Sequence, residues 1–322
     1  MSGEIRLDFE QLPALAPSYF RAVANFGSGL AKGDTIPAIV ARLNDLEVRA
    51  ENLARYRKVC GFPRAETLPL TYPHALAFPM HMAVLTHKRF PLKLLGLIHV
   101  RNHITQHRAI RVDEPLDLIV SVGGHRDVAK GVEFDLTTQV KDAAGDTIWE
   151  ETGVMLSRGK SGGSGGASGQ SKQPPELGFT PDEEATWQVP ADIGRRYAAA
   201  AGDYNPIHLS PWSARLFGFP RAIATGMWVK ARAAAALQPH VAREAYSLSV
   251  AFKKPVFLPS TVLFKEAGGD NGLHFALTSR AGDTHHLTGE VRYISNGGSD
   301  RSRAVDGRPD AATNDSDQLG KG

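Results

Sequence analysis

The sequence predicts an α+β protein in which two similar units, each an antiparallel sheet wrapped around a central helix, follow one another in one chain. Three observations lead to this fold class. Two blocks of ordinary globular composition, residues 1–158 and 176–295, flank a Gly/Ser-rich segment. Each block ends in alternating apolar and polar residues around an Ala-Gly-Asp turn, which is typical of a β-hairpin. Each block also places an apolar, helix-compatible stretch before its strands.

The two blocks carry the same series of elements in the same order. Each reads as an apolar helix, then a strand stretch with a proline and a charged turn, then a hairpin. The matching pairs are 74–86 and 225–238, 104–122 and 248–265, and 132–158 and 273–295. This period of well over a hundred residues is too long for a solenoid repeat. We therefore interpret it as the duplication of a whole domain.

Two segments are predicted to lie outside the folded blocks. Residues 159–175 are almost purely Gly, Ser and short polar residues before two prolines, a composition that behaves as a flexible linker. Residues 296–322 contain no aromatic side chain. Burial there cannot offset the entropy of ordering the chain. We expect a linker over the first segment and a disordered tail over the second.

Length, charge and cysteine content exclude several classes of protein. The chain has 322 residues, enough for two hydrophobic cores, and a net charge of +3, too small to argue for nucleic acid. No apolar run is long enough to cross a bilayer, and the first residues lack the pattern of a secretory signal. A single cysteine, Cys60, excludes an internal disulfide and a cysteine-based zinc cluster. We expect a cytoplasmic protein that binds neither nucleic acid nor a membrane.

The segment 192–226 holds the residues with catalytic chemistry. Asp192 suits the N-cap of a helix, and Gly202 suits the residue that ends it. Asp203 and His208 then lie on either side of an Asn-Pro pair, and proline restricts both its own backbone and that of the preceding residue. A carboxylate and an imidazole are therefore expected together on a stiff loop.

Each of these residues also has a structural interpretation. Asp203 alone would cap a turn, His208 alone would be a hydrogen-bonded core histidine, and Gly226 alone would be a tight helix start. The functional interpretation rests on their occurrence together and in order. It is strengthened by the spacing of the whole segment.

That spacing resembles the MaoC-like dehydratase family, the (R)-specific enoyl-thioester hydratases of hotdog fold. The signature Gly-Asp-x-Asn-Pro-x-His occurs at 202–208, followed by Ala214, by Gly-Phe at 218–219 and by Ile-Ala-Thr-Gly-Met at 223–227. The first block matches only in overall pattern, and the segment 55–63 stands roughly where its loop would be. The resemblance implies a tandem (double) hotdog in which one half keeps the motif and the other has lost it.

The family's reaction is the reversible syn addition of water to a trans-2-enoyl thioester, which gives the (R)-3-hydroxyacyl thioester. The resemblance implies that Asp203 and His208 hold one water and move its protons. It also implies that the N–H of Gly226, at a helix N-terminus, polarises the thioester. The acid and base roles within the pair are left open. The expected substrate-binding residues are Asn205, Thr225 and Met227.

The resemblance implies no metal or redox cofactor, a CoA or acyl-carrier-protein thioester as substrate, and a homodimer of double-hotdog chains as a candidate assembly. Two residues depart from the family: Thr225 replaces a usual His, and Ala234 replaces a frequent Ser. Outside the motif, His285 and His286 are adjacent on an expected strand. Their side chains would point to opposite faces, which makes them poor metal ligands together.

Two alternative functions stay open. A hotdog thioesterase would need a carboxylate near the substrate, and the central helix at 226–237 contains none. A non-catalytic acyl-thioester-binding protein would keep the fold without turnover. Thr225 and Ala234 are compatible with such a protein, whereas the intact Asp203 and His208 count against it.

Overall fold

The computed structural model describes residues 3–24, 29–31, 33–94, 96–159 and 176–294. The tail expected over 296–322 lies outside these residues, as does the expected linker apart from Gly159. Both therefore stay predictions, and so do the domain boundaries based on them. Among the described helices, none combines the length and the hydropathy needed to cross a bilayer.

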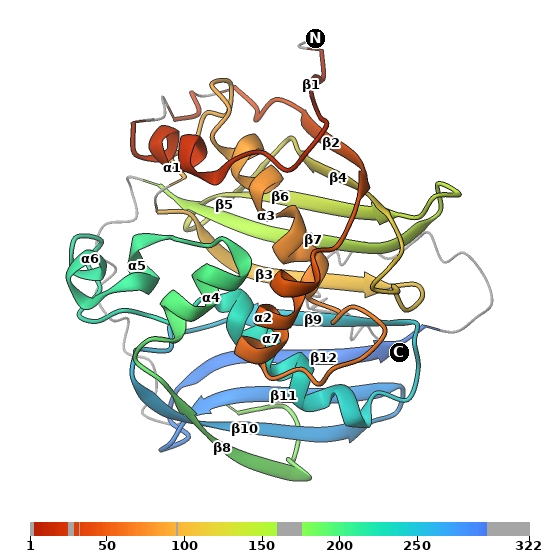
Figure 1. Cartoon of the computed structure of the whole chain (residues 1–322). Coiled ribbons are helices and arrows are strands. Elements are labelled where there is room, and N and C mark those ends of the chain that lie inside the picture. Colours follow the sequence, from red (N-terminus) through yellow and green to blue (C-terminus); the bar gives the residue numbers. More distant parts are fainter. Residues whose placement is uncertain (1–2, 25–28, 32, 95, 160–175, 295–322) are drawn as a thin grey trace, which may run out of the picture.

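One twelve-stranded sheet contains every strand of the described chain (Figure 1). Its first half runs in the order β1 (Ile5–Phe9), β2 (Ile39–Leu46), β4 (Leu116–Val122), β6 (Gly131–Lys141), β7 (Thr147–Arg158) and β3 (Ile98–Gln106), with β5 (Arg126–Val128) beside β6. The second half continues with β9 (Tyr246–Phe252), β12 (His285–Tyr293), β11 (Gly272–Ser279), β10 (Ser260–Gly269) and β8 (Glu183–Val189). Neighbouring strands are antiparallel except β1 and β2, which are parallel.

The two halves meet where β3 pairs with β9. This pairing runs from Arg101 opposite Ala251 to Gln106 opposite Tyr246. The sheets therefore join edge to edge, as expected for a double hotdog. Neither half leaves its inner edge strand unpaired.

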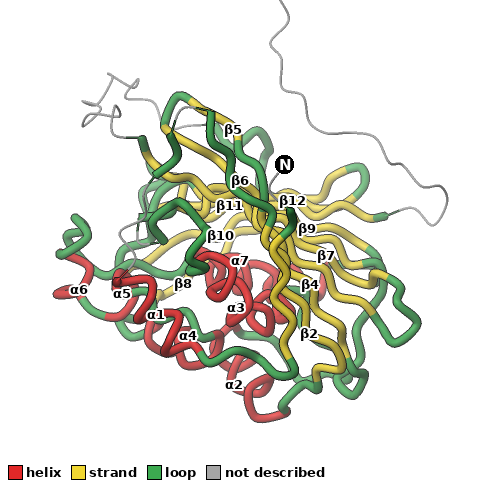
Figure 2. The backbone as a smooth tube through the Cα atoms, turned by 90° about the horizontal axis from the view of Figure 1, so that it is seen from above, coloured by secondary structure: helices red, strands yellow, loops and turns green. Residues whose placement is uncertain are grey.

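Two central helices, α3 (Tyr72–Leu85) and α7 (Gly226–Leu237), are enclosed by the sheet, whose strands curve around them (Figure 2). This confirms the two helices expected at 74–86 and 225–238. The remaining helices are α1 (Leu15–Ala24), α2 (Ala50–Cys60), α4 (Ile193–Ala201), α5 (Pro206–Leu209), α6 (Pro211–Arg215) and the 3₁₀ helix η1 (Gln238–His240). Of these, α2 and α4 pack against each other across the two halves.

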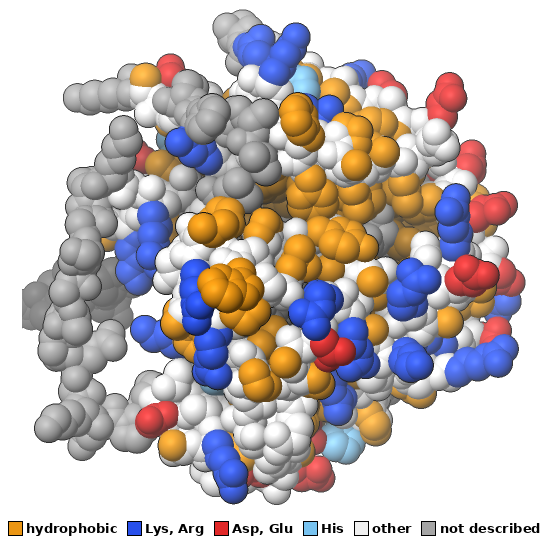
Figure 3. All heavy atoms as spheres, turned by 60° about the vertical axis from the view of Figure 1, so that its left-hand side comes forward, with side chains coloured by type: hydrophobic (Ala, Val, Ile, Leu, Met, Phe, Trp, Pro, Cys, Tyr) orange, Lys and Arg blue, Asp and Glu red, His pale blue; other side chains and the backbone are white. Residues whose placement is uncertain are grey.

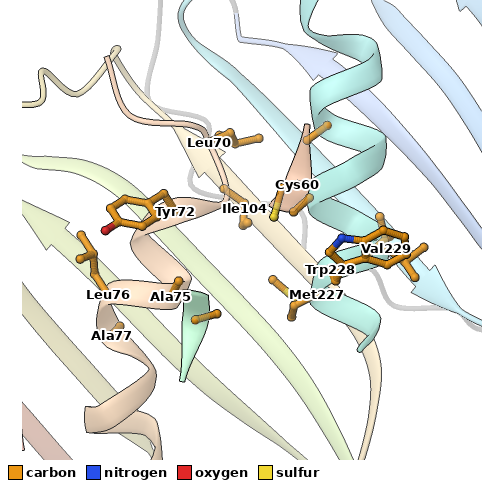
Figure 4. Packing of buried hydrophobic residues seen from close by; sticks show 14 of the residues in the cluster. Cys60, Leu70, Tyr72, Ala75, Leu76, Ala77, Ile104, Met227, Trp228 and Val229 are labelled. Carbon is orange, nitrogen blue, oxygen red and sulfur yellow. The ribbon is translucent and has the colours of Figure 1, made fainter. Parts of the chain in front are cut away.

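The packing follows from the sequence pattern. In β4, residues alternate between buried and half-buried positions, so one face of the strand lies against the core. In α7, Ala231, Ala233 and Ala235 are buried, and their small side chains let other elements approach closely. Figure 4 shows the core between the halves, where Cys60 of α2 and Met227 of α7 belong to one hydrophobic cluster.

The strand stretches at 104–122 and 248–265 differ from expectation. Each contains two separate strands, β3 and β4 in the first half and β9 and β10 in the second. The strands of each pair are not neighbours, because a hairpin lies between them in the sheet. The prolines mark the connections, since proline cannot donate to a strand ladder.

Candidate active site

Asp203 and His208 meet at the short turn between α4 and α5. His208 Nε2 lies 3.9 Å from Asp203 Oδ2, and the two side chains are 8% and 19% exposed. This separation is too long for a direct hydrogen bond. It allows one water molecule to contact both groups. The structure thus brings together the two side chains that the sequence placed in one motif.

The turn is stabilised by its own side chains. Asn205 Oδ1 accepts a hydrogen bond from the N–H of Ile207 at 3.4 Å and caps α5, with Pro206 as the first helical residue. Asp203 Oδ1 accepts from the N–H of Asn205 at 3.2 Å. The expected stiff loop is therefore a tight turn followed by a short helix that carries His208. Asn205 Oδ1 serves this helix cap.

His208 is held by a main-chain hydrogen bond and by the space that a glycine leaves. Its Nδ1–H donates to the carbonyl of Ile223 at 2.8 Å. Because a carbonyl can only accept, the neutral imidazole carries its proton on Nδ1 and presents the lone pair of Nε2 toward Asp203. Gly194 of α4 makes room for this position, since a Cβ there would lie 1.9 Å from the carbonyl oxygen of His208. A larger residue at 194 would displace His208.

Gly226 begins α7 close to this pair. Ile223 is hydrogen-bonded to both Ile207 and His208, which ties the segment before α7 to the site. The first N–H groups of a helix have no intrahelical acceptor and form the positive end of the helix dipole. A Cβ on Gly226 would lie 3.1 Å from the ring of Phe252, so this approach favours glycine.

Thr225 and Met227, on either side of Gly226, differ in their surroundings. Thr225 is buried, and its Oγ1 has no hydrogen-bond partner among the described residues. A buried hydroxyl of this kind is available to a substrate or a water. Met227 packs in the hydrophobic core. Of the two, Thr225 is the one with an unpartnered polar atom among the described residues.

The first half contributes Tyr19 of α1 to the site. Its hydroxyl donates to the carbonyl of Gly202 at 2.8 Å and accepts from the N–H of Tyr204 at 2.6 Å. One phenol thus holds the residues before and after Asp203. Burial, and then the charge of Asp203, raise the pKa of Tyr19 above its usual value. The sequence analysis missed this residue, because Tyr19 lies 183 positions from Gly202 in the chain.

The corresponding turn of the first half has lost its carboxylate. Helices α2 and α4 both end at a glycine with left-handed backbone, Gly61 at φ 85° and Gly202 at φ 81°. The next residue is Asp203 in the second half and Phe62 in the first. Phe62 is buried and stacks on Tyr56 at a ring distance of 6.4 Å. An apolar side chain therefore fills this place in the first half.

A buried polar network crosses the junction of the halves. Lys230 Nζ of α7 donates to the side-chain oxygen of Asn102 on β3 and, at 2.9 Å, to the carbonyl of Leu248. Asn102 Nδ2 donates to Glu151 Oε1 of β7 at 2.7 Å, and His74 Nδ1 of α3 lies 2.9 Å from the same carboxylate. No sequence pattern had indicated this network, since its members come from four separate elements.

Burial sets the charges in this network. Burial lowers the pKa of Lys230 to about 7, against the opposing effect of Glu151. Burial also raises the pKa of Glu151, but His74, His81 and Lys230 together outweigh it and lower that pKa to about 2. Glu151 is therefore an ionised carboxylate at neutral pH.

The network lies next to the candidate active site. Phe252, which faces Gly226, contacts His99 at a ring distance of 5.1 Å. His99 Nε2 in turn accepts from Asn102 Nδ2 at 3.3 Å. Burial lowers the pKa of His99 to about 3, so it remains neutral. Two side chains, His99 and Phe252, therefore lie between the network and the first residue of α7.

Comparison with known proteins places the chain in a family. The family model described as MaoC like domain matches residues 172–289. Over 282 residues, 87% of this chain and 98% of the relative, the chain is 36% identical to 3-hydroxyacyl-thioester dehydratase X of Mycobacterium tuberculosis. The chain belongs to the MaoC-like dehydratase family. The resemblance inferred from 202–227 is thereby confirmed.

Solved structures confirm the fold of this MaoC-like dehydratase. The crystal structure of HtdX of Mycobacterium tuberculosis matches with a TM-score of 0.68 and 34% identity, over 79% of this chain and 100% of that chain. A second Mycobacterium tuberculosis protein, described as having a double hotdog fold, matches with a TM-score of 0.50 and 13% identity. That match covers 82% of this chain and 96% of the other, and shows the fold alone.

Proposed function

We propose that this chain is an (R)-specific 3-hydroxyacyl-thioester dehydratase that also catalyses the reverse hydration of trans-2-enoyl thioesters. The observation that carries this proposal is the Asp203–His208 pair, 3.9 Å apart, next to the N-terminus of α7. The relative that is 36% identical is named as a 3-hydroxyacyl-thioester dehydratase, which supports the same reaction class. Asp203, His208 and Gly226 are the proposed catalytic residues.

Hydration needs one water and two proton transfers. The water lies between Asp203 and His208, its oxygen bonds to C3 of the enoyl thioester, and one of the pair takes its proton. A proton then reaches C2, so the elements of water are added across the double bond. In its neutral form His208 presents a lone pair at Nε2, so it accepts a proton before it can return one. Both residues contact the same water, and we leave the acid and base roles shared between them.

The thioester oxygen gains negative charge during the addition. In our proposal the N–H of Gly226 donates to this oxygen, supported by the dipole of α7. The unpartnered hydroxyl of Thr225 lies next to this donor and is the proposed second polar contact. Asn205 contributes through the turn that it caps, and Met227 through the apolar wall next to Gly226.

The substrate is proposed to enter from the face that carries α1, α5 and α6. Figure 3 shows hydrophobic side chains gathered there beside lysine and arginine side chains. Large exposed hydrophobic residues include Phe20, Trp212 and Leu216, and Arg215 stacks on Trp212 at 5.3 Å. Tyr204, next to Asp203 in the chain, is also exposed. This mixture suits the apolar and phosphate portions of a CoA or acyl-carrier-protein thioester. We expect no further cofactor.

One assay separates this function from the alternatives. Crotonyl-CoA and a longer enoyl-CoA are incubated with the full chain, and the enoyl absorbance and the free thiol are followed together. Loss of the enoyl absorbance without free thiol supports the hydratase. Release of thiol would identify a thioesterase, and no change in either signal would identify a binding protein. The cytoplasmic location and the homodimer stay predictions from the sequence.

A further inference from the structure

Glu266 occupies a position on the core face of β10 that the strand pattern assigns to an apolar residue. Val262, Phe264 and Glu266 are alternate residues and share this face. All three are buried, at 1%, 3% and 8% exposure. A carboxylate has thus replaced the apolar side chain expected at the end of this row.

The neighbour of Glu266 across the strand pair carries the same charge. Glu183 of the edge strand β8 is directly opposite Glu266, and like charges opposite one another destabilise a sheet. The adjacent position shows the contrast. There Lys265 faces Glu184, with Nζ 3.0 Å from Oε2. The strands are therefore matched in charge on one face and mismatched on the other.

His240 of η1 contacts one oxygen of Glu266, and the other oxygen has no partner among the described residues. His240 Nδ1 lies 2.8 Å from Glu266 Oε1. Oε2 of Glu266 is buried and has no hydrogen-bond partner among the described residues. Leaving a buried oxygen without a partner costs free energy. The like-charge neighbour and the unpartnered oxygen both belong to Glu266, and a positively charged ligand would satisfy both.

We propose that Glu183, His240 and Glu266 bind a divalent cation of the Zn²⁺ class. Single ligand atoms of the three side chains lie within 4.8 Å of one another. Imidazole nitrogen and carboxylate oxygen are both ligand atoms that Zn²⁺ binds, and a water in the fourth position would complete a tetrahedral set. The cation would offset the charge of both carboxylates. His240 must bind as neutral imidazole, so any proton on the ligating nitrogen is released to solvent or moves to Nε2.

A second group of ligand atoms is a weaker candidate. His74, His81 and Glu151 also lie within 4.8 Å of one another. Both oxygens of that carboxylate already have partners, however, in His74 and Asn102. This cluster therefore has no unmet need for a cation.

The proposed ion lies far from the proposed chemistry. His240 follows the C-terminus of α7, whereas Gly226 begins the helix, and a helix of 12 residues is about 18 Å long. The ion would instead join η1 to β10 and to the edge strand β8. It is a structural site, independent of the dehydratase proposal. It also departs from the sequence-based expectation of no metal.

The test uses the full chain without a histidine tag and with ZnCl₂ as the probe. Titration calorimetry and thermal unfolding with and without the ion are compared for four proteins: wild type, Glu183→Gln, His240→Ala and Glu184→Gln. Both ligand substitutions replace exposed side chains, so folding without metal is expected. We expect them to lower Zn²⁺ affinity by at least about tenfold and to abolish the Zn²⁺-dependent rise in melting temperature. Glu184→Gln, on the opposite face, should match wild type.

Four outcomes would overturn the proposal. The first is that wild type fails to bind Zn²⁺. The second is that Glu183→Gln and His240→Ala bind Zn²⁺ as tightly as wild type, which would show that the ion binds at another site. Equal loss in Glu184→Gln would point to a general effect of acidic residues. Equal stabilisation by Mg²⁺ would show that the imidazole is not a ligand, since Mg²⁺ prefers oxygen ligands. Hydratase activity is measured alongside and is expected not to depend on Zn²⁺.

Discussion

Lys230 on the central helix of the second half donates a hydrogen bond to the side chain of Asn102 on the inner edge strand of the first. Both residues are almost completely buried, at 0% and 1% exposure. Asn102 in turn donates to Glu151. Lys230 of α7 is therefore linked through Asn102 to a carboxylate of the other half. Specific polar contacts join the halves in addition to the paired strands.

Replacing Lys230 with Met should destabilise the fold. The methionine would fill much of the space but leave the acceptors on Asn102 and Leu248 without their donor. The free energy of unfolding should fall by about 1–3 kcal/mol, the cost of such unpaired groups. Urea denaturation measures this, with Lys58→Met on the exposed face of α2 as the control. Equal stability of the two variants would contradict the role of the network.

The proposed roles of Asp203 and His208 predict the effect of two conservative substitutions. Asp203→Asn and His208→Gln should each lower kcat by about 10²–10⁴-fold, the usual contribution of a general acid or base. Both side chains are close in size to the originals, so circular dichroism should show an unchanged fold. The measurement is the hydration rate of crotonyl-CoA. A folded variant with most of the wild-type activity would end the assignment.

Tyr19 should act by positioning Asp203. Tyr19→Phe removes the hydroxyl that bonds to Gly202 and Tyr204. Losing such hydrogen bonds costs about 0.5–1.5 kcal/mol. We therefore expect kcat to fall roughly 3- to 10-fold with little change in KM. The control is Ala16→Ser, which changes an exposed residue on the same helix. An equal fall in kcat for both variants would show a general effect of altering α1.

Acid should destabilise the protein through its buried histidines. Burial, reinforced by His74, lowers the pKa of His81 from 6.5 to about 3. The unfolded chain takes up this proton at higher pH than the folded chain does. The free energy of unfolding that depends on His81 is therefore at its full value above about pH 6.5 and decreases as the pH falls toward 3. Glu151, with its pKa lowered from 4.5 to about 2, acts in the same direction at lower pH.

The matching experiment compares melting temperatures at pH 7.5 and pH 4.5. His81→Gln keeps a hydrogen-bonding group near Thr138, the partner of His81 at 2.7 Å, but no longer titrates. Its melting temperature should fall less with pH than that of wild type, since each pKa unit of difference corresponds to about 1.4 kcal/mol. His274→Gln, an exposed substitution on β11, leaves the buried groups unchanged. A pH dependence of His81→Gln identical to wild type would refute the prediction.

The second half should not function alone. Expressed as 176–295, it would expose the unpaired edge of β9 and leave Lys230 without Asn102. We expect an aggregating or inactive product by size-exclusion chromatography and assay. Cleavage of the intact chain within 159–175 should instead leave two associated, active fragments, since the pairing of β3 with β9 and the bond from Lys230 to Asn102 do not depend on chain continuity there. A soluble and fully active 176–295 would contradict this prediction.

Local sequence patterns predicted the parts of the fold that depend on neighbouring residues. Hairpins, central helices and the Gly202 helix end each follow from spacing or backbone preference within a few positions. The elements of the first 60 residues were not predicted, and the contacts of Tyr19 and Lys230 were missed. These contacts join residues far apart in the chain, so no local pattern reports them. Burial of Lys230 was hidden for the same reason, because its acceptors lie on other strands.

The pairing of β3 with β9 also has a consequence during synthesis of the chain on the ribosome. Gln106 is hydrogen-bonded across this pairing to Glu244, 138 positions later. At about 5–20 residues per second, the ribosome needs roughly 7 to 28 s to make that stretch. Throughout that interval β3 has an open edge. Arg101 on this strand is exposed, and a charged side chain on an edge strand discourages pairing with other chains. Before it pairs with Ala251, Arg101 is thus expected to keep this open edge from aggregating.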